Sequence, residues 1–223
     1  MTAFPRWLEW LHRILFRSDP IERADLIFVF AGHRSRKFWA VRLFHEGWAP
    51  RVLISTGDPP YIARLVRREI GHSGVPDEQI WTDIANTAAL PSPQMGQFFV
   101  CLDDKEWSVE QISVGWFGTL SETEALAQWL ERHPSIRSLL IVSVGIHLRR
   151  VEMCCQQLIP QYCRIRLVAV PPHVADLTGR EQTPEHIATR GILLEWVKVL
   201  MYRGILLLRG RHRKSRPSVS DLG

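Results

Sequence analysis

The chain has 223 residues, 46% of them hydrophobic, and its mean hydropathy is −0.07. This length and composition are typical of a globular protein with one α/β domain or two small domains. The net charge is +5, but 23 basic residues remain to balance the 23 acidic ones when five near the C-terminus are set aside: Arg209, Arg211, Arg213, Lys214 and Arg216. The near-neutral body argues against a broad nucleic-acid-binding surface, and we expect no specific nucleic-acid partner.

Cysteine spacing and hydropathy bear on the compartment. The four cysteines show no metal-site spacing, and two are adjacent in sequence: Cys101, Cys154, Cys155 and Cys163. We therefore expect reduced thiols and a cytoplasmic protein. No signal peptide is evident, and no uncharged apolar run of about 18 residues predicts a transmembrane helix.

Residues 4–17 are predicted to form an amphipathic helix, which Ser18-Asp19-Pro20 ends. Its apolar side chains recur at helical spacing: Phe4, Trp7, Leu8, Leu11, Ile14 and Leu15. Two interpretations stay open. The helix packs on the domain, or it lies in a membrane interface with Trp and Arg at the level of the headgroups.

Two strand–helix units follow this segment. Residues 25–30 form an apolar run that predicts a buried strand, and residues 36–46 predict a helix that ends at Gly47. Residues 51–54 predict a second strand, followed by a helix as far as about Gly71. This alternation predicts a parallel sheet with right-handed crossovers.

Residues 83–111 are predicted to be an insertion in this pattern. Residues 79–81 are a candidate strand before it, residues 97–102 are a candidate extra strand, and residues 111–114 are another. Whether the insertion adds strands or forms a lid stays open.

Residues 119–132 are predicted to form the next helix. Ser121 and Glu124 have the spacing of a capping box, in which each residue satisfies a free backbone N–H. That interpretation gives both residues a purely structural role.

The stretch 139–153 combines a strand, a turn and a helix. Residues 139–142 form an uninterrupted apolar run, as expected for a strand covered on both faces. His147 and Arg150 are three residues apart at the start of the following helix, so they share a face. A helix N-terminus favours anions, although both residues also suit an ordinary surface or cap.

A last strand is predicted at residues 164–170, followed by a long helix from Pro184 to about Leu208. Charges within this helix make a membrane span costly: Glu195, Lys198 and Arg203. Residues 192–216 combine an apolar helix with a basic end, which suits an anionic membrane surface. The alternative is a core helix followed by a solvated tail.

Three strand ends carry small or polar residues, and in a parallel sheet they converge where ligands bind. The helix that begins at Ser121 would point its N-terminus at the same crevice, which predicts a site for phosphate or carboxylate. The candidate ligand-binding residues are Gly32, His33, Arg34, Ser55, Thr56, Gly57, Asp58, Ser121, Glu124, Ser143, His147 and Arg150.

Roles follow from the chemistry of three of these side chains. Arg150 would neutralise the ligand, His147 would donate a hydrogen bond or transfer a proton as the one catalytic candidate, and Glu124 would hold a hydroxyl if it does not cap its helix. No dinucleotide, Walker or nucleophile-elbow motif is present. No closely spaced carboxylate accompanies His33 and His147, so no metal site is expected.

Several short motifs occur in a specific order over residues 24–204: Phe28–Gly32, Gly47–Pro50, Ser55–Gly57, Gly74–Pro76, Ser121–Ala125, Val142–Val151 and the Glu195, Lys198, Tyr202, Arg203 set. In this order the chain resembles the bacterial YdcF/SanA/ElyC-like domain family. It departs from the family pattern at Ala31, Thr56 and Ser143.

The resemblance implies a Rossmann-like three-layer α/β/α fold with a mostly parallel sheet, and a pocket at the strand ends named above. It also implies a link to cell-envelope biogenesis, and S-adenosylmethionine as one candidate ligand. We expect an N-terminal helix in residues 1–20, the α/β domain in 21–208 and a basic disordered tail in 209–223.

Three functional hypotheses result. The first is a protein that binds a small anionic or nucleotide-like ligand, in the cytoplasm or at the inner face of the plasma membrane. The second is a hydrolase or transferase acting on a phosphorylated or lipid-linked envelope precursor. The third is a membrane-peripheral scaffold, held by residues 4–17 and 192–216, with an inert pocket.

Overall fold

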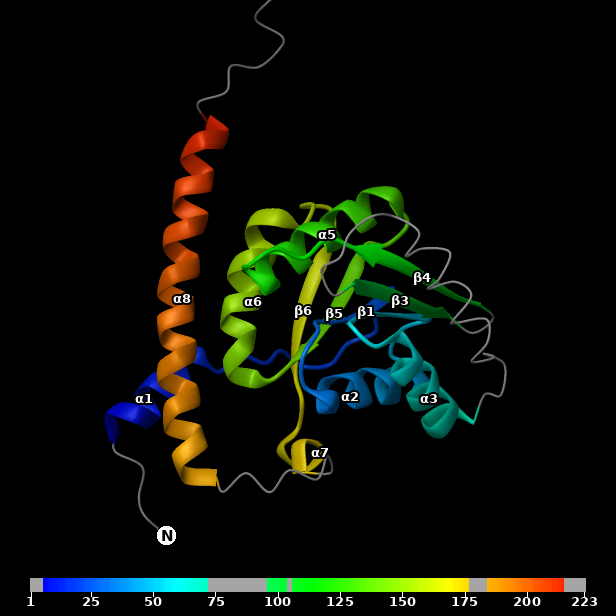
Figure 1. The fold of residues 1–223 in the computed structure, drawn as a ribbon, viewed down its shortest axis with the longest axis horizontal. Coiled ribbons are helices and arrows are strands. Elements are labelled where there is room, and N and C mark those ends of the chain that lie inside the picture. The colour runs from blue at the N-terminus through cyan, green and yellow to red at the C-terminus, as the bar shows by residue number, and fades with distance from the viewer. Residues whose placement is uncertain (1–5, 72–95, 104–105, 177–183, 215–223) are drawn as a thin grey trace, which may run out of the picture.

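The computed structural model describes residues 6–71, 96–103, 106–176 and 184–214. Its centre is a six-stranded sheet in the order β4-β3-β2-β1-β5-β6 (Figure 1). The strands are β1 (Leu26–Val29), β2 (Arg51–Thr56), β3 (Gln97–Asp103), β4 (Trp107–Ile112), β5 (Ser138–Ser143) and β6 (Arg164–Ala169). β2, β1, β5 and β6 are mutually parallel, and β3 and β4 each run antiparallel to their neighbour.

Helices cover both faces of this sheet. They are α1 (Arg6–Leu15), α2 (Arg34–His45), α3 (Pro59–Ile70), α5 (Gly118–Arg132), α6 (Gly145–Leu158), α7 (Pro172–Asp176) and α8 (Pro184–Lys214). α2 and α3 pack on one face, and α5 and α6 pack on the other (Figure 1). The predicted Rossmann-like three-layer α/β fold is confirmed, while α7 was not predicted.

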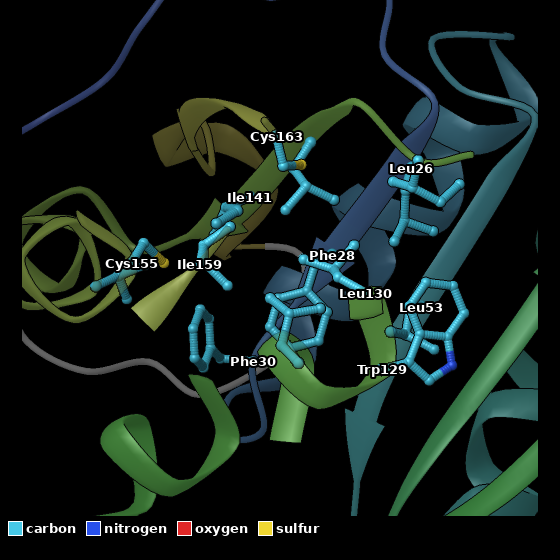
Figure 2. Close-up of a cluster of buried hydrophobic side chains, with 14 of the residues drawn as sticks. Leu26, Phe28, Phe30, Leu53, Trp129, Leu130, Ile141, Cys155, Ile159 and Cys163 are labelled. Atoms are coloured by element: carbon cyan, nitrogen blue, oxygen red, sulfur yellow. The ribbon is translucent and has the colours of Figure 1, made fainter. Parts of the chain in front are cut away.

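The central strands are buried on both faces, which explains their continuous apolar runs. Along β1, Leu26 and Phe28 face the α5–α6 layer, and Ile27 and Val29 face the α2–α3 layer. Figure 2 shows the first of these two clusters, in which the rings of Phe28 and Phe30 meet edge-on with centroids 4.9 Å apart. The cluster also holds Cys155 and Cys163, which are unpaired as expected.

The predicted insertion supplies the antiparallel edge of the sheet. β3 confirms the strand expected at residues 97–102, and its residues Phe98–Asp103 pair with β2. The strand expected at 111–114 is instead β4, which begins at Trp107, because Gln97 opposite Ile112 fixes the hairpin register. The candidate strand at 79–81 and the Gly74–Pro76 motif lie outside the described residues.

α1 and α8 form a further layer outside α6 (Figure 1). A small apolar cluster joins the two helices through Leu8, Leu15, Ile192 and Val199. α8 continues to Lys214 without a break, so the helix end predicted near Leu208 is wrong. The first residues of the predicted tail, from 209 onward, therefore belong to the helix. An exposed glycine such as Gly204 costs a long, packed helix only about 1 kcal/mol, too little to end it.

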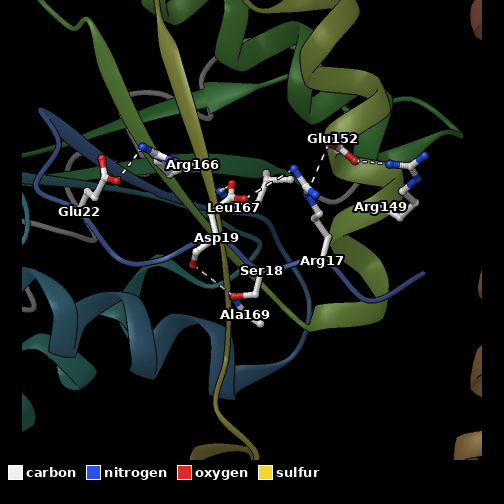
Figure 3. Close-up of polar contacts among 9 residues, drawn as sticks. All are labelled: Arg17, Ser18, Asp19, Glu22, Arg149, Glu152, Arg166, Leu167 and Ala169. Carbon is white, nitrogen blue, oxygen red and sulfur yellow. Dashed lines mark hydrogen bonds and ion pairs between the residues drawn. The ribbon is translucent and has the colours of Figure 1, made fainter. Parts of the chain in front are cut away.

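The segment after α1 covers the free edge of β6, where unpaired backbone groups would otherwise be exposed. The Asp19 N–H donates to the Leu167 carbonyl at 2.6 Å, and the Leu167 N–H donates to Asp19 Oδ2 at 2.9 Å (Figure 3). Ser18 Oγ accepts from the Ala169 N–H at 3.1 Å. The Ser-Asp-Pro sequence that ends α1 therefore also caps the sheet.

Gly145, the first residue of α6, allows this segment to approach closely. The Phe16 ring lies so near that a Cβ added to Gly145 would fall 2.3 Å from Phe16 Cε2. The Arg17 N–H also donates to the Gly145 carbonyl at 3.2 Å. A side chain at this turn between β5 and α6 would therefore require the half-exposed Phe16 ring to move.

Gly145→Ala should lower the free energy of unfolding by about 1–3 kcal/mol, because the added methyl overpacks the Phe16 contact. Gly204→Ala is the matched control, since nothing lies within 4 Å of its added Cβ. It should raise stability by about 0.5–1 kcal/mol through helix propensity. Urea denaturation of both variants checks this, and an unchanged stability for Gly145→Ala would contradict the packing.

Candidate functional site

Buried polar side chains gather at the carboxyl ends of β1, β2 and β5, where a parallel sheet places ligands. They come from both helical layers and from α8: Lys37, Ser55, Thr56, Thr119, Glu122, Thr123, Ser143, His147 and Glu195. Polar groups removed from water need partners, and the hydrogen bonds among these residues supply most of them. The cluster divides into two halves, one around His147 and one around Glu122.

His147 lies between β5 and α5. Its Nδ1 is 2.6 Å from Ser143 Oγ, and its Nε2 is 3.2 Å from Thr119 Oγ1. The ring stands edge-on to Phe30, with centroids 6.1 Å apart. Burial holds the pKa of His147 well below its ordinary value, with a further lowering by Arg36, Arg150 and Lys198, so the imidazole is neutral near pH 7.

The surrounding hydrogen bonds favour one neutral tautomer of His147. Thr119 Oγ1 accepts from Arg150 Nη1 at 2.7 Å, which leaves the hydroxyl proton free to be donated to His147 Nε2. The proton assigned to Nδ1 is then donated to Ser143 Oγ. In this assignment both ring nitrogens of His147 have a hydrogen-bond partner.

Arg150 connects three helices. From α6, its Nε donates to Glu195 Oε1 of α8 at 2.7 Å, and its Nη1 donates to Thr119 of α5. The guanidinium also lies 5.1 Å from the centroid of the Tyr202 ring. Glu195 Oε2 is 3.6 Å from Lys198 Nζ. The positive charge of Arg150 is therefore largely compensated by the carboxylate of Glu195.

Glu122 is the central acid of the second half of the site. Its Oε2 accepts from the N–H of Ala31, two residues after the end of β1, at 2.8 Å. Burial raises the pKa of Glu122, while the bonds to Ala31 and Ser55 and the charges of Arg36 and Lys37 oppose that rise. One carboxylate thus faces two cations.

Both of those cations come from the first turn of α2. Lys37 Nζ donates to Thr56 Oγ1 at 2.9 Å, and Arg36 Nη1 donates to the Ala31 carbonyl at 3.2 Å. Burial lowers the pKa of Lys37, and it lowers the pKa of Arg36 to about 10, so Arg36 stays charged at neutral pH. Arg36 Nε is buried without a hydrogen-bond partner among the described residues.

Of the residues expected in the site, Ser143, His147 and Arg150 belong to one hydrogen-bonded network that runs through Thr119. Ser55 and Thr56 are buried at the end of the neighbouring part of the sheet, on β2. The other expected residues in the loops that follow β1 and β2 are exposed, at the rim of the site: Gly32, His33, Arg34, Gly57 and Asp58. Gly32 has φ 119°, which favours glycine.

Two rim residues act as helix caps. His33 Nδ1 accepts from the Ser35 N–H at 3.4 Å at the start of α2, and Asp58 Oδ1 accepts from the Tyr61 N–H at 3.0 Å at the start of α3. Arg34 lies over the Tyr61 ring, 4.9 Å from its centroid.

The capping box predicted for Ser121 and Glu124 is wrong. α5 begins at Gly118 after Phe117, and no side chain caps it. Ser121 Oγ therefore donates back to the Phe117 carbonyl at 3.3 Å. Glu124 is half-exposed and pairs with Arg209 of α8. Because residues two apart on a helix face nearly opposite sides, Glu122 rather than Glu124 points to the strand ends.

Sequence reasoning also missed Arg36, Lys37 and Thr119 as site residues. The sequence does carry a usable signal for two charged residues, Lys37 and Glu122. Lys37 falls four residues before the buried Val41, and Glu122 falls four before the buried Leu126. A charge inside an apolar stripe at helical spacing indicates a buried, partnered group.

Within the described ranges, no three His, Cys, Asp or Glu side chains are grouped closely enough to hold a metal ion. Comparisons of the chain with protein-family models, with curated proteins and with solved structures found no match.

The neutral, buried state of His147 predicts a pH-dependent contribution to stability. Above its ordinary pKa of 6.5, the stability of the wild type relative to His147→Gln should be constant. Below that pH it should shrink by up to about 1.4 kcal/mol per pH unit, because the unfolded chain binds a proton that the folded site excludes.

Urea denaturation from about pH 7 to about pH 5 measures this difference. The variant His45→Gln, on the exposed surface of α2, controls for the loss of an imidazole elsewhere. A difference that stays constant or grows on acidification would show that His147 is not held neutral.

Proposed function

We propose that this chain is a YdcF-like protein that binds a small anionic ligand, of phosphate or nucleotide type, at the carboxyl ends of β1, β2 and β5. The supporting observation is a charge imbalance. Among the described residues, the cations there are the buried Lys37 and the partly buried Arg36 and Arg150, against the buried carboxylates of Glu122 and Glu195. Neutral His147 adds no charge. Uncompensated buried charge is unfavourable, and a bound anion offsets it.

The excess charge lies on the Arg36–Lys37 side of the site. Arg150 has its own carboxylate and a hydroxyl, whereas Arg36 and Lys37 share the buried Glu122. The other carboxylate that acts on Lys37, Asp58, is exposed, and the other that acts on Arg36, Glu195, is already paired with Arg150. Both belong to the first turn of α2, whose N-terminus adds partial positive charge. The glycine turn at Gly32 lets a ligand approach the backbone closely. In this proposal Glu122 is an internal anion that competes with the ligand for the two cations.

The same charge balance distinguishes between candidate ligands. S-adenosylmethionine carries a sulfonium and an ammonium against one carboxylate, so its net charge is positive. A site with excess cations does not fit that group well, and it fits a phosphate better. A phosphorylated envelope precursor or a nucleotide is therefore the favoured class, in keeping with the family resemblance.

Lys37→Met should weaken binding of the true ligand roughly 30-fold or more, because it removes a buried charge partner of the anion. Glu122→Gln should strengthen binding, because it removes the competing carboxylate.

Thermal unfolding of the full chain in the presence of inorganic phosphate, nucleotides, sugar nucleotides, polyprenyl phosphates and S-adenosylmethionine identifies the ligand. Titration calorimetry then gives the affinities.

Arg68→Met is the matched control, because Arg68 is an exposed cation on α3 whose loss should leave affinity unchanged. Circular dichroism verifies that each variant is folded. The proposal is overturned if no compound shifts the wild-type unfolding temperature, or if Lys37→Met binds as tightly as the wild type. A response to S-adenosylmethionine alone would contradict the preference for phosphate.

A further inference from the structure

The outer face of α8 is apolar and exposed. Its large side chains have exposed fractions between 42% and 63%: Leu193, Leu194, Val197, Leu200, Met201, Leu207 and Leu208. They recur three, four or seven residues apart, so they lie on one side of the helix. The opposite side, with Ile192, Val199, Tyr202 and Leu206, is buried against the protein. A helix that is apolar all round is normally covered all round, and the described residues cover only half of it.

α1, which packs against α8, also exposes aromatic side chains. Trp7 and Trp10 are 53% and 60% exposed, and Ile14 and Phe16 are exposed beside them. α1 is held against α8 by the cluster of Leu8 and Leu15, at the margin of the molecule away from the sheet (Figure 1). The two helices together present Trp, Leu, Ile and Val side chains to the outside, the composition that binds a membrane interface.

The charges around this surface are mainly basic. After Glu195, which is buried, α8 has no acidic residue as far as Lys214. Among its basic residues in that stretch, Lys198 and Arg209 pair with Glu195 and Glu124, and Arg203 is exposed. The sequence adds Arg211, Arg213 and Lys214 towards the end of the helix. α1 carries one acid, Glu9, against Arg6 and Arg13. A partner for this surface must therefore be apolar at its centre and negatively charged around it.

We propose that the outer faces of α8 and α1 dock on the surface of an anionic phospholipid bilayer, with the helices lying in the interface. A second copy of the chain is a poorer occupant. Pairing two α8 helices through this face would bring basic residues against basic residues, because α8 has no acidic residue after Glu195. No helix within the described ranges is both long and apolar enough to cross a bilayer. This inference stands on α1 and α8 and does not depend on the proposed ligand.

Vesicle co-sedimentation of the full chain tests the docking. The chain should bind vesicles of phosphatidylglycerol and phosphatidylcholine on the order of tenfold or more tightly than vesicles of phosphatidylcholine alone, and added salt should reduce that difference. Leu200→Gln/Leu207→Gln should weaken binding by on the order of tenfold or more, since two inserted leucines are lost.

Two charge variants give a matched comparison. Arg203→Gln/Arg211→Gln removes two charges from α8, and Arg64→Gln/Arg68→Gln removes two from α3 on the other side of the molecule. The α8 variant should bind anionic vesicles roughly fivefold more weakly per charge removed, and the α3 variant should bind like the wild type. Equal effects of the two variants would overturn the proposal, because they would reflect net charge alone.

Light scattering of the chain without vesicles tests whether a second copy of the chain covers this face instead. A monomer is expected for the wild type and for Leu200→Gln/Leu207→Gln, both with the same circular dichroism and melting temperature. A wild-type dimer that this variant converts to a monomer would overturn the proposal, because a second copy would then cover the face. Absence of binding to anionic vesicles would overturn it as well.

Discussion

The ion pair between Arg150 and Glu195 is the interaction on which the outer half of the molecule depends. It joins α6 to α8 across 45 residues of sequence, with both side chains about nine-tenths buried. The same guanidinium bonds to Thr119 and so fixes the first turn of α5 beside His147. A buried pair of this kind contributes little net stability, because desolvation offsets the attraction, but losing either partner is costly. Its value to the fold is that it specifies where α8 docks.

The polar site around that pair has two halves, which differ in their charge balance. On one side, Arg150, Thr119, His147 and Ser143 form a satisfied network with a neutral imidazole, which is suited to holding the strand ends in place. On the other side, the two cations of α2, Arg36 and Lys37, share the one buried carboxylate of Glu122. The further carboxylates that act on them are Asp58, which is exposed, and Glu195, which is paired with Arg150. α8 connects this site to the surface, since its inner face carries Glu195 and its outer face is the proposed membrane contact.

The fold could be predicted from the sequence because its signals are local. The runs at β1 and β5 are apolar on both faces, and the turns at Gly47 and Gly71 have positive φ at residues suited to it. The site could be predicted only in part, because its partners are set by tertiary packing. The Ser121–Glu124 spacing matched a capping box, but α5 begins at Gly118 after Phe117, whose ring packs edge-on to Tyr202 of α8. No local pattern encodes that contact, or the pairing of Arg150 with Glu195.

A double-mutant cycle between Arg150 and Glu195 tests the central claim most directly. The free energies of unfolding of Arg150→Met, Glu195→Gln and the double variant would be compared with that of the wild type by urea denaturation. We predict a coupling energy of about 1.5 kcal/mol or more, because each single change leaves a buried partner without its counterpart. Additive effects within about 0.5 kcal/mol would contradict the claim that this ion pair fixes α8 on the domain.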